Sequence, residues 1–340
     1  MNTPPRTRTG QPVLTVIAFI ALVPGCALIA GLPDWREATG DDVRDGSKTD
    51  SNDTDGAMPF DATPLTDGSE QLDGAKNDAD ETGVLPGTCD LTKPFALPVV
   101  MVDINSTETD AFARLSADER TIYFETTRLG GVSKIFRSIR NSRTAPFPAP
   151  VPLPEADLGP MNEFAPTVTP DGLTFFMHAT DGSSAKALYS GTRLSTSMPF
   201  DLPTAVAIPA PARHPYLVTG GVYYVAGSEG GPYSIVFAKL SPLSLSAVSF
   251  QNPPANGFVA PVVSPDKLVF YGSANGRIWK ATRLTDTAPF DTPAEVIELN
   301  DVAADQFPDW ISPDGCRIYF HRTGSVSGGI EIYVAEKPPK

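Results

Sequence analysis

The sequence predicts an all-β domain, a five-bladed β-propeller, and three observations support that fold class. A unit built on a Ser/Thr-Pro-Asp-Gly turn, or a variant of it, recurs five times between about residue 91 and the C-terminus. Each turn joins two apolar segments of strand length, and the second is dense in aromatic residues. The 35 prolines and 28 glycines are high for a helical protein and usual for short strands joined by turns. A six-bladed ring would require a blade that the sequence does not show.

The first 25 residues have the features of a lipoprotein-type signal peptide. Arg6 and Arg8 precede an apolar run at residues 13–23, which a Pro-Gly pair separates from Cys26. A basic start, a short apolar stretch and a small residue before a cleavage point are typical of a secretory signal. The four residues that end at Cys26 resemble a lipobox, so we expect cleavage after residue 25 and a lipid on the Cys26 thiol. The alternatives are an ordinary signal peptide and an uncleaved anchor, since apolar character continues to about 20 residues in total.

All of these alternatives place the bulk of the chain outside the cytoplasm, with Arg6 and Arg8 left inside. We expect an exported protein that is lipid-anchored to the bacterial cell envelope, on the periplasmic or the surface face of the outer membrane. The membrane is then one partner, reached through the lipid. Nucleic acid is excluded as a partner, because the net charge is −14 and no basic face is present to neutralise phosphates.

Residues 26–90 are expected to form a disordered, Asp-rich tether. Between Asp34 and Glu81 about 15 acidic residues stand against about 4 basic ones, with little apolar periodicity. Such a segment does not bury enough surface to offset the entropy of ordering it. Two Asp-Gly spans loosely resemble calcium loops, but neither keeps the ligand register of a calcium site. We therefore expect the tether to be a solvated spacer between the membrane and the folded domain.

The propeller is expected over residues 91–340. The opening aromatic residues of the five units are spaced by about 42 to 52 positions, a period that suits a four-stranded blade. These aromatic residues are Phe112, Phe164, Tyr216, Phe258 and Phe307. The second strands follow the turns, at Ile122–Phe124, Phe175–Met177, Tyr223–Val225, Val269–Tyr271 and Ile318–Phe320. A loop rich in Gly, Ser and Asp then leads to a third strand.

A fourth, outer strand is marked by a Pro-Phe-x-x-Pro signature after three of the third strands. The last unit ends at Ile330–Glu336 without this signature, whereas Lys93–Ile104 carries it before the first unit. The start of the domain is therefore expected to pair with the last blade, a "velcro" closure that leaves no open sheet edge.

The repeated pattern Ser-Pro-Asp-Gly-x-x-Ile-Tyr-Phe resembles the WD40-like propeller repeats of TolB and of related envelope lipoproteins. The copy at residues 104–131 is the most similar, and the resemblance covers about 245 residues. It implies a TolB-like propeller fold. It implies little about function, because a propeller is a scaffold on which many functions sit.

Two cysteines remain if a lipid occupies Cys26. Cys316 follows the first turn of the last blade, and Cys89 precedes the velcro strand, so both are expected at the same end of that blade. In an oxidising compartment they form a natural disulfide pair. Such a bond would clamp the closure and stabilise the fold by about 4 kcal/mol through loop entropy. The alternative is two unpaired, small apolar residues.

The chain carries few motifs for chemistry. His178, His214 and His321 lie in different units without metal-ligand spacing, so we expect no metal and no cofactor. Nucleophile elbows, phosphate loops and His-Glu-x-x-His motifs are absent from the sequence, which leaves no catalytic residue to assign. The serine of each turn recurs from unit to unit, which indicates a structural role. The recurrence of Arg140, Arg193 and Arg283 indicates the same for them, and Trp279 and Trp310 are expected in the core.

Polar residues at the start of the inner strands form a weaker candidate ligand face. Glu163 and Asp309 break the repeat, whereas the others recur two residues before the opening aromatic residue, as capping residues do. The candidate face comprises Asp110, Asn162, Glu163, Asn256, Asp305 and Asp309. The favoured function is a non-enzymatic, envelope-anchored scaffold that binds a protein, a peptide or a glycan. The alternative is a five-bladed glycoside hydrolase with carboxylates around a central funnel, and a module for small ligands has no distinguishing residue.

Overall fold

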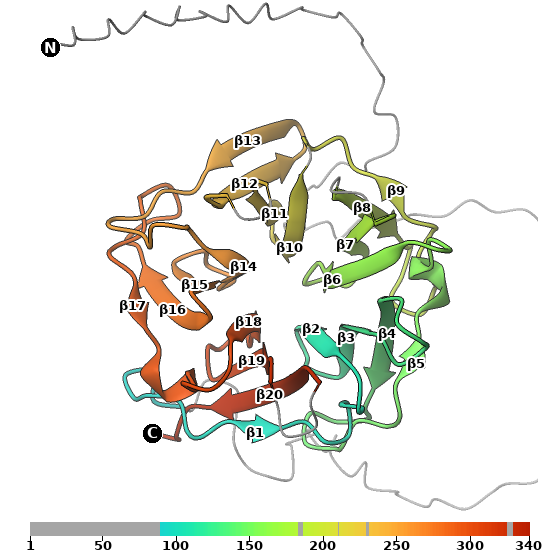
Figure 1. Cartoon of the computed structure of the whole chain (residues 1–340), viewed down its shortest axis with the longest axis horizontal. Helices are drawn as coiled ribbons and strands as arrows, with labels where there is room; N and C mark the ends of the chain where they lie inside the picture. The colour runs from blue at the N-terminus through green and yellow to red at the C-terminus, as the bar shows by residue number, and fades with distance from the viewer. Residues whose placement is uncertain (1–88, 183–185, 210, 229–230, 325–328) are drawn as a thin grey trace, which may run out of the picture. The chain divides into compact units, whose positions relative to one another are not determined.

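The computed structural model describes residues 89–182, 186–209, 211–228, 231–324 and 329–340. Within these ranges twenty strands form five four-stranded antiparallel sheets, arranged as blades around a common axis (Figure 1). The other regular elements are two single-turn helices, η1 (Pro154–Ala156) and η2 (Ile297–Leu299). Neither described helix has the length or the apolar composition to span a membrane. The prediction of an all-β, five-bladed propeller is confirmed.

Four blades are built from consecutive strands that run from the axis outward. Blades 1 and 2 contain β2 (Asp110–Leu115), β3 (Thr121–Thr126), β4 (Lys134–Ile139), β5 (Val151–Pro152), β6 (Asn162–Val168), β7 (Thr174–Thr180), β8 (Ala187–Thr192) and β9 (Thr204–Ala205). Blades 3 and 4 contain β10 (Ala212–Val218), β11 (Gly221–Ala226), β12 (Ser234–Leu240), β13 (Leu243–Ala247), β14 (Val259–Val263), β15 (Val269–Ala274), β16 (Arg277–Thr282) and β17 (Ala294–Glu295). In blade 3 the outer strand β13 follows β12 as a hairpin and lacks the Pro-Phe-x-x-Pro signature.

Blade 5 combines the two ends of the domain. Its strands are β18 (Gln306–Ile311), β19 (Arg317–Arg322), β20 (Glu331–Glu336) and, from the start of the domain, β1 (Val99–Val100). Strand β1 pairs with β20 in the register that places Val99 opposite Val334 (Figure 1). The predicted velcro closure is therefore present, and it was the signature in Lys93–Ile104 that located it.

Apolar side chains fill the space between neighbouring blades. One cluster joins Tyr123 and Ile135 of blade 1 to Phe175 and Met177 of blade 2, and all four are buried. The aromatic second strands predicted from the sequence supply much of this packing. Each blade thus buries its faces against its two neighbours, which is why the ring needs all five blades to cover its core.

A recurring cation–π contact holds the outer segment of four blades to the rest of the blade. In three blades an arginine after the third strand lies over the phenylalanine of the Pro-Phe-x-x-Pro signature and donates through Nε to a turn carbonyl. The pairs are Arg140 with Phe147, Arg193 with Phe200 and Arg283 with Phe290, with 4.3, 4.2 and 4.3 Å from guanidinium carbon to ring centroid. Their Nε atoms lie 2.8, 2.6 and 2.7 Å from the turn carbonyls. In blade 5 Lys337 takes this place, 4.2 Å over Phe95 of the velcro segment.

The hydroxyl groups of the Ser/Thr-Pro-Asp-Gly turns serve the turns themselves. Each donates to the aspartate two residues on, at 2.5 Å, and accepts the N–H that opens the second strand, at 2.8–2.9 Å. The hydroxyls belong to Ser116, Thr169, Ser264 and Ser312. Both functions of each hydroxyl are thus occupied, which leaves no activated serine nucleophile in these turns.

Two side-chain links reinforce the seam at which the ring closes. The structure joins Cys89 to Cys316 in a disulfide with 5.8 Å between the Cα atoms. Arg317, the residue after Cys316, donates from Nε to Glu119 Oε2 at 2.7 Å and from Nη2 to Glu119 Oε1, which links blade 5 to blade 1. Glu119 replaces the glycine of the turn and keeps the left-handed backbone, at φ 57°. Its departure from the turn pattern is therefore explained by this buried ion pair.

Loss of the disulfide should lower the stability of the whole ring. The bond closes a loop of 227 residues, so Cys316→Ser should lower the free energy of unfolding by about 2–5 kcal/mol, the range for loss of a native disulfide. Thermal unfolding with and without reductant measures the effect. Reductant should destabilise the parent chain and leave Cys89→Ser/Cys316→Ser unchanged. Equal melting temperatures for the oxidised parent and the variant would contradict the proposed clamp.

Candidate functional site

Each inner strand carries a bulge at the same distance from its first turn. Register shifts interrupt all five pairings between first and second strands. In four blades the bulged residue has a left-handed backbone, with φ of 52° at Phe112, 47° at Ala165, 49° at His214 and 51° at Ala260. Such a backbone costs a non-glycine residue about 1–3 kcal/mol and persists only where the surroundings fix it. The bulge also removes one N–H from the ladder, and that N–H needs another partner.

Side chains of neighbouring blades accept these N–H groups. In two blades the acceptor is the fifth residue of the second strand, which reaches across the seam to the next blade: Ala165 N donates to Glu125 Oε2 (2.7 Å) and His214 N donates to His178 Nδ1 (3.3 Å). The fifth residue of β19 is His321, whose Nδ1 lies 3.4 Å from Phe112 N and 2.8 Å from Asp309 Oδ1, and the shorter contact uses Nδ1 as the donor to Asp309. Blade 3 has Val225 at that position, and the His214 side chain accepts the Ala260 N–H instead, at 3.4 Å. In blade 4 the Ser273 hydroxyl crosses the seam and donates to the Gln306 carbonyl, at 2.7 Å.

The same residues fill the axis of the ring. The Phe112 ring of blade 1 stacks on His214 of blade 3, with 4.8 Å between centroids, and lies 4.6 Å from His321 of blade 5. His178 contacts His214 edge-on at 5.3 Å. Small alanines at the equivalent positions of blades 2 and 4 leave room for these rings. We refer to Phe112, Arg114, Glu125, His178, His214, Asp309 and His321 as the axial cluster.

The convergence of the three histidines was missed in the sequence, where their different units suggested separate locations. The opening aromatic residue Tyr216 seemed to match Phe112, whereas the bulge register places His214 at that position and Tyr216 at the position equivalent to Arg114. Burial lowers the pKa of His178 and His214 well below the usual value, so both imidazoles are neutral acceptors. Among the described residues, no three His, Cys, Asp or Glu side chains are grouped so that they could hold a metal ion.

Charged groups of the axial cluster are almost fully buried. Asp309 is 0% exposed, and its Oδ1 lies 2.8 Å from His321 Nδ1. Arg114 is 1% exposed, lies over the Tyr216 ring at 4.9 Å, and has its Nη1 4.0 Å from Asp309 Oδ1, too far for a hydrogen bond. Within the described part of the chain, Arg114 Nε, Nη1 and Nη2 have no hydrogen-bond partner. A buried guanidinium with unused donors is costly, and among the described residues Arg114 has the most buried side-chain atoms without a partner.

Glu125 is the protonated member of the cluster. The pKa of its carboxyl is raised to about 8, mainly because the side chain is buried; the Ala165 N–H lowers the pKa, Asp309 raises it and Arg114 lowers it. At neutral pH the side chain is therefore mostly neutral. It still accepts the Ala165 N–H, so its protonation does not break the link between blades 1 and 2.

A pocket of about 190 Å³ opens beside the cluster on the face that carries the Ser/Thr-Pro-Asp-Gly turns. Its mouth is a ring of one exposed turn residue from each blade: Ala117, Pro170, Thr219, Pro265 and Pro313. Leu115, Val168, Leu217, Val263 and Ile311 form much of its apolar lining, and Arg114, Thr167, Tyr216 and Trp310 line it as well. We call this the turn-face pocket. It places an apolar funnel over the unsatisfied guanidinium of Arg114.

The candidate ligand face predicted from the strand starts is not assembled as one site. Asp110 is buried, with a 2.6 Å ion pair to Arg128, and Asn162 accepts the Ser133 N–H. Asn256 and Asp305 are exposed. Of the six residues only Asp309 reaches the axial cluster. The physical reason is that the strand starts lie at the end of the blades opposite the turns, where the loops use polar side chains to satisfy their backbone.

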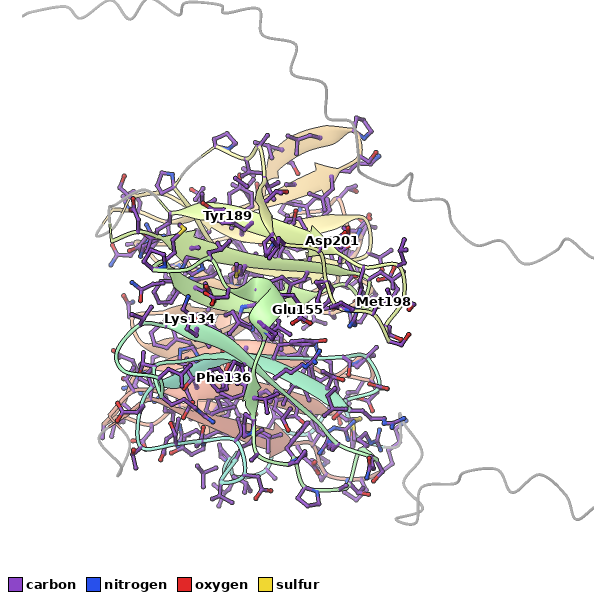
Figure 2. All side chains as sticks on the ribbon, turned by 90° about the vertical axis from the view of Figure 1, so that its right-hand side faces the viewer. Lys134, Phe136, Glu155, Tyr189, Met198 and Asp201 are labelled. Carbon is purple, nitrogen blue, oxygen red and sulfur yellow. A yellow bond between two sulfur atoms is a disulfide. The ribbon has the colours of Figure 1, made fainter. Side chains whose placement is uncertain are left out.

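Glu163 illustrates how such a residue is used. Its carboxylate accepts a hydrogen bond from Lys134 Nζ at 2.7 Å, and the same ammonium group bonds Asp157 at 2.7 Å (Lys134 is labelled in Figure 2). The Glu163 carboxylate also accepts the Leu158 N–H at 2.8 Å. Lys134 and Glu163 belong to blades 1 and 2, so this irregularity of the repeat is a link across a seam.

Comparisons with known proteins support the fold and do not identify a function. No family model matches the chain, and no curated protein matches it in sequence. Among solved structures, TolB from Acinetobacter baumannii aligns with 70% of this chain at 12% identity and a TM-score of 0.46, and the chain covers 57% of that protein. A TolB-like structure from Agrobacterium tumefaciens aligns with 68% at 14% identity, covers 84% of that chain and has a TM-score of 0.43. A GH43_1 enzyme from Xanthomonas citri aligns with 71% at 13% identity, covers 91% of that chain and has a TM-score of 0.48. The likeness is to the propeller fold alone, which the TolB structures and the GH43_1 enzyme share.

The protonation of Glu125 should make stability depend on pH. Its pKa is 4.5 in an ordinary setting and about 8 in the fold, so the folded state binds more protons between those values. The stability that the neutral carboxyl contributes is full below this window and is lost as pH rises through it, by up to about 1.4 kcal/mol per pH unit. Glu125→Gln should flatten the profile of melting temperature between pH 5 and 8.5. The exposed Glu108→Gln is the control, and an unchanged profile in Glu125→Gln would refute the assignment.

Proposed function

We propose that this chain is a non-enzymatic binding scaffold, a TolB-like β-propeller lipoprotein anchored to the cell envelope. The observation that carries the proposal is the chemistry of the turn-face pocket. Of the described residues that line it, none is an aspartate or a glutamate. Glycoside hydrolysis requires two carboxyl groups on either side of the scissile bond, within reach of the sugar. A funnel of apolar residues, Thr167, Tyr216 and Arg114 is suited to recognition instead.

The glycoside hydrolase is the second candidate, and one observation favours it. A carboxyl with a pKa raised to about 8 beside a second carboxylate is the arrangement in which a general acid is held protonated. Glu125 and Asp309 are, however, 5% and 0% exposed, and they are occupied by the Ala165 N–H and by His321. Neither side chain lines the turn-face pocket. A substrate would have to open the axis of the ring to touch them.

Export and anchoring rest on the N-terminal residues. The proposed signal peptide, the lipid site at Cys26 and the acidic tether to residue 88 lie outside the described residues. The disulfide between Cys89 and Cys316 supports an exported location, since disulfides persist in oxidising compartments. A lipid at Cys26 would hold the ring at a membrane while the tether separates the two.

Mass spectrometry of the mature N-terminus tests the anchor. The chain purified from membranes should begin at Cys26 and carry the added mass of acyl groups. Cys26→Ser should move the protein from the membrane fraction to the soluble fraction without changing its melting temperature. An unmodified Cys26 or an intact signal segment in the mature chain would exclude the lipoprotein.

Site-directed photo-cross-linking in intact envelopes tests the scaffold. A photoreactive residue at Ala117, on the mouth of the pocket, should give a defined cross-linked product, whereas one at the exposed Ser244 of the β13 edge should not. Release of reducing sugar from plant or bacterial polysaccharides, abolished by Asp309→Asn, would overturn the non-enzymatic proposal. Equal cross-linking from both positions would show that the mouth is not the binding face.

A further inference from the structure

We infer that the turn-face pocket binds a carboxylate carried on an apolar stem, with the carboxylate seated on Arg114. The inference rests on the proposed function, a binding ring, and adds the class of ligand. Three features of the pocket lead to it: the unused, buried donors of Arg114, which lines it, its apolar walls and its mouth.

Arg114 supplies the charge. Arg114 lines the pocket, is 1% exposed, and uses none of Nε, Nη1 and Nη2 in a hydrogen bond with any described residue. The guanidinium fork matches the two oxygens of a carboxylate, and such charge-assisted pairs are among the strongest polar contacts in proteins. Asp309 lies 4.0 Å away and engages His321 at 2.8 Å, so it balances the charge of Arg114 without occupying its donors.

The neighbours of Arg114 leave that role open to a ligand. Glu125 is neutral at pH 7, because burial raises its pKa to about 8. His178 and His214 are neutral as well, because burial lowers the pKa of each imidazole. Asp309 faces Arg114 at 4.0 Å and lies within hydrogen-bond distance of His321 instead. The Tyr216 ring covers another side of the guanidinium, which keeps solvent away from it.

The walls select the rest of the ligand. Leucine, valine and isoleucine side chains from blades 1 to 5 and the Trp310 ring surround the path from the mouth to Arg114. Burial of an apolar stem along this path contributes roughly 25 cal/mol per Å² of surface removed from water. A free sugar has hydroxyl groups that these walls do not satisfy. A volume of about 190 Å³ suits a small aliphatic or aromatic group rather than a polymer segment.

Two sources offer this chemistry, a free apolar acid and the C-terminal residue of a peptide that ends in an apolar side chain. Both present one carboxylate on one apolar group, and the ring of turn residues is open to solvent for either. The test therefore uses a probe from each source and a neutral counterpart of each.

Calorimetric titration of the full chain measures the selectivity. The free-acid arm compares 3-phenylpropanoate with 3-phenylpropanamide, and the peptide arm compares a pentapeptide ending in Phe with its C-terminal amide. The acid should bind at least tenfold more tightly than its amide, since hydrogen bonds between two charged groups are stronger than those to a neutral group. The arm with the higher affinity for its acid identifies the source.

Variants separate the pocket from the fold. Arg114→Met should abolish the preference for acid over amide, a ratio that a general loss of folded protein does not move. Ala117→Trp, at the exposed mouth, should weaken acid and amide alike and leave Arg114 in place. Arg120→Met removes an exposed arginine outside the pocket and should change neither affinity.

Absence of acid binding, or equal affinities for acid and amide in the parent chain, would overturn the inference. The scaffold proposal fails on a different result. If cross-linking at the mouth persists without acid selectivity, the ring still binds a partner but not through Arg114. If sugar release is found, the non-enzymatic proposal falls whether or not the acid binds.

Discussion

The ring depends on how its inner strands satisfy the N–H groups that their bulges set free. A bulge turns each inner strand at the axis and leaves one donor without a ladder partner. In this protein the partner is a side chain of another blade, as when Glu125 of blade 1 accepts the Ala165 N–H of blade 2. Because the acceptor and the donor belong to different sheets, the same bond that satisfies the backbone also fixes the angle between two blades. The left-handed backbone at four of these positions persists for the same reason.

This constraint explains the composition of the axis and the location of the pocket. Acceptors are needed at the second strands, and neutral imidazoles and a protonated carboxyl meet that need without placing further charge in the interior. The rings of Phe112, His214 and His321 then fill the axis. The turn-face pocket stays open, between the bulges of the inner strands and the Ser/Thr-Pro-Asp-Gly turns. Arg114 lies at this boundary, two residues beyond the bulge, where the polar axis meets the apolar funnel.

Local sequence signals were enough for the blades and their closure. The Ser/Thr-Pro-Asp-Gly turn, the aromatic second strand and the Pro-Phe-x-x-Pro signature each act within one blade or between neighbouring segments, so they could be recognised by repetition. The velcro strand could be predicted because one Pro-Phe-x-x-Pro signature precedes the first unit, whereas the last unit has none. The outer strand β13 was missed because its hairpin uses a different connection. Glu119 is a further case, since its departure from the turn pattern is explained only by Arg317, 198 residues away.

The axial cluster could not be predicted in the same way. Its members come from blades that are far apart in the chain, and their register depends on bulges that leave no fixed signature. An alignment of aromatic residues shifted Tyr216 by two positions relative to His214, which hid the convergence of three histidines. The candidate ligand face was predicted at the strand starts, and not at Glu125, for a related reason. Polar residues that recur there serve loops, whereas the buried Glu125 looked like part of an ordinary strand.

The protonation and tautomer of the axial histidines test this account most directly. Nitrogen NMR of the full chain labelled at histidine, recorded from pH 5 to 8, reports both. His178 and His214 should stay neutral across the range, because burial lowers the pKa of each, and should carry their proton on Nε2, because Nδ1 accepts a backbone N–H. Protonation of either ring near pH 6, or a proton on Nδ1, would contradict the claim that these side chains hold the bulged strands together.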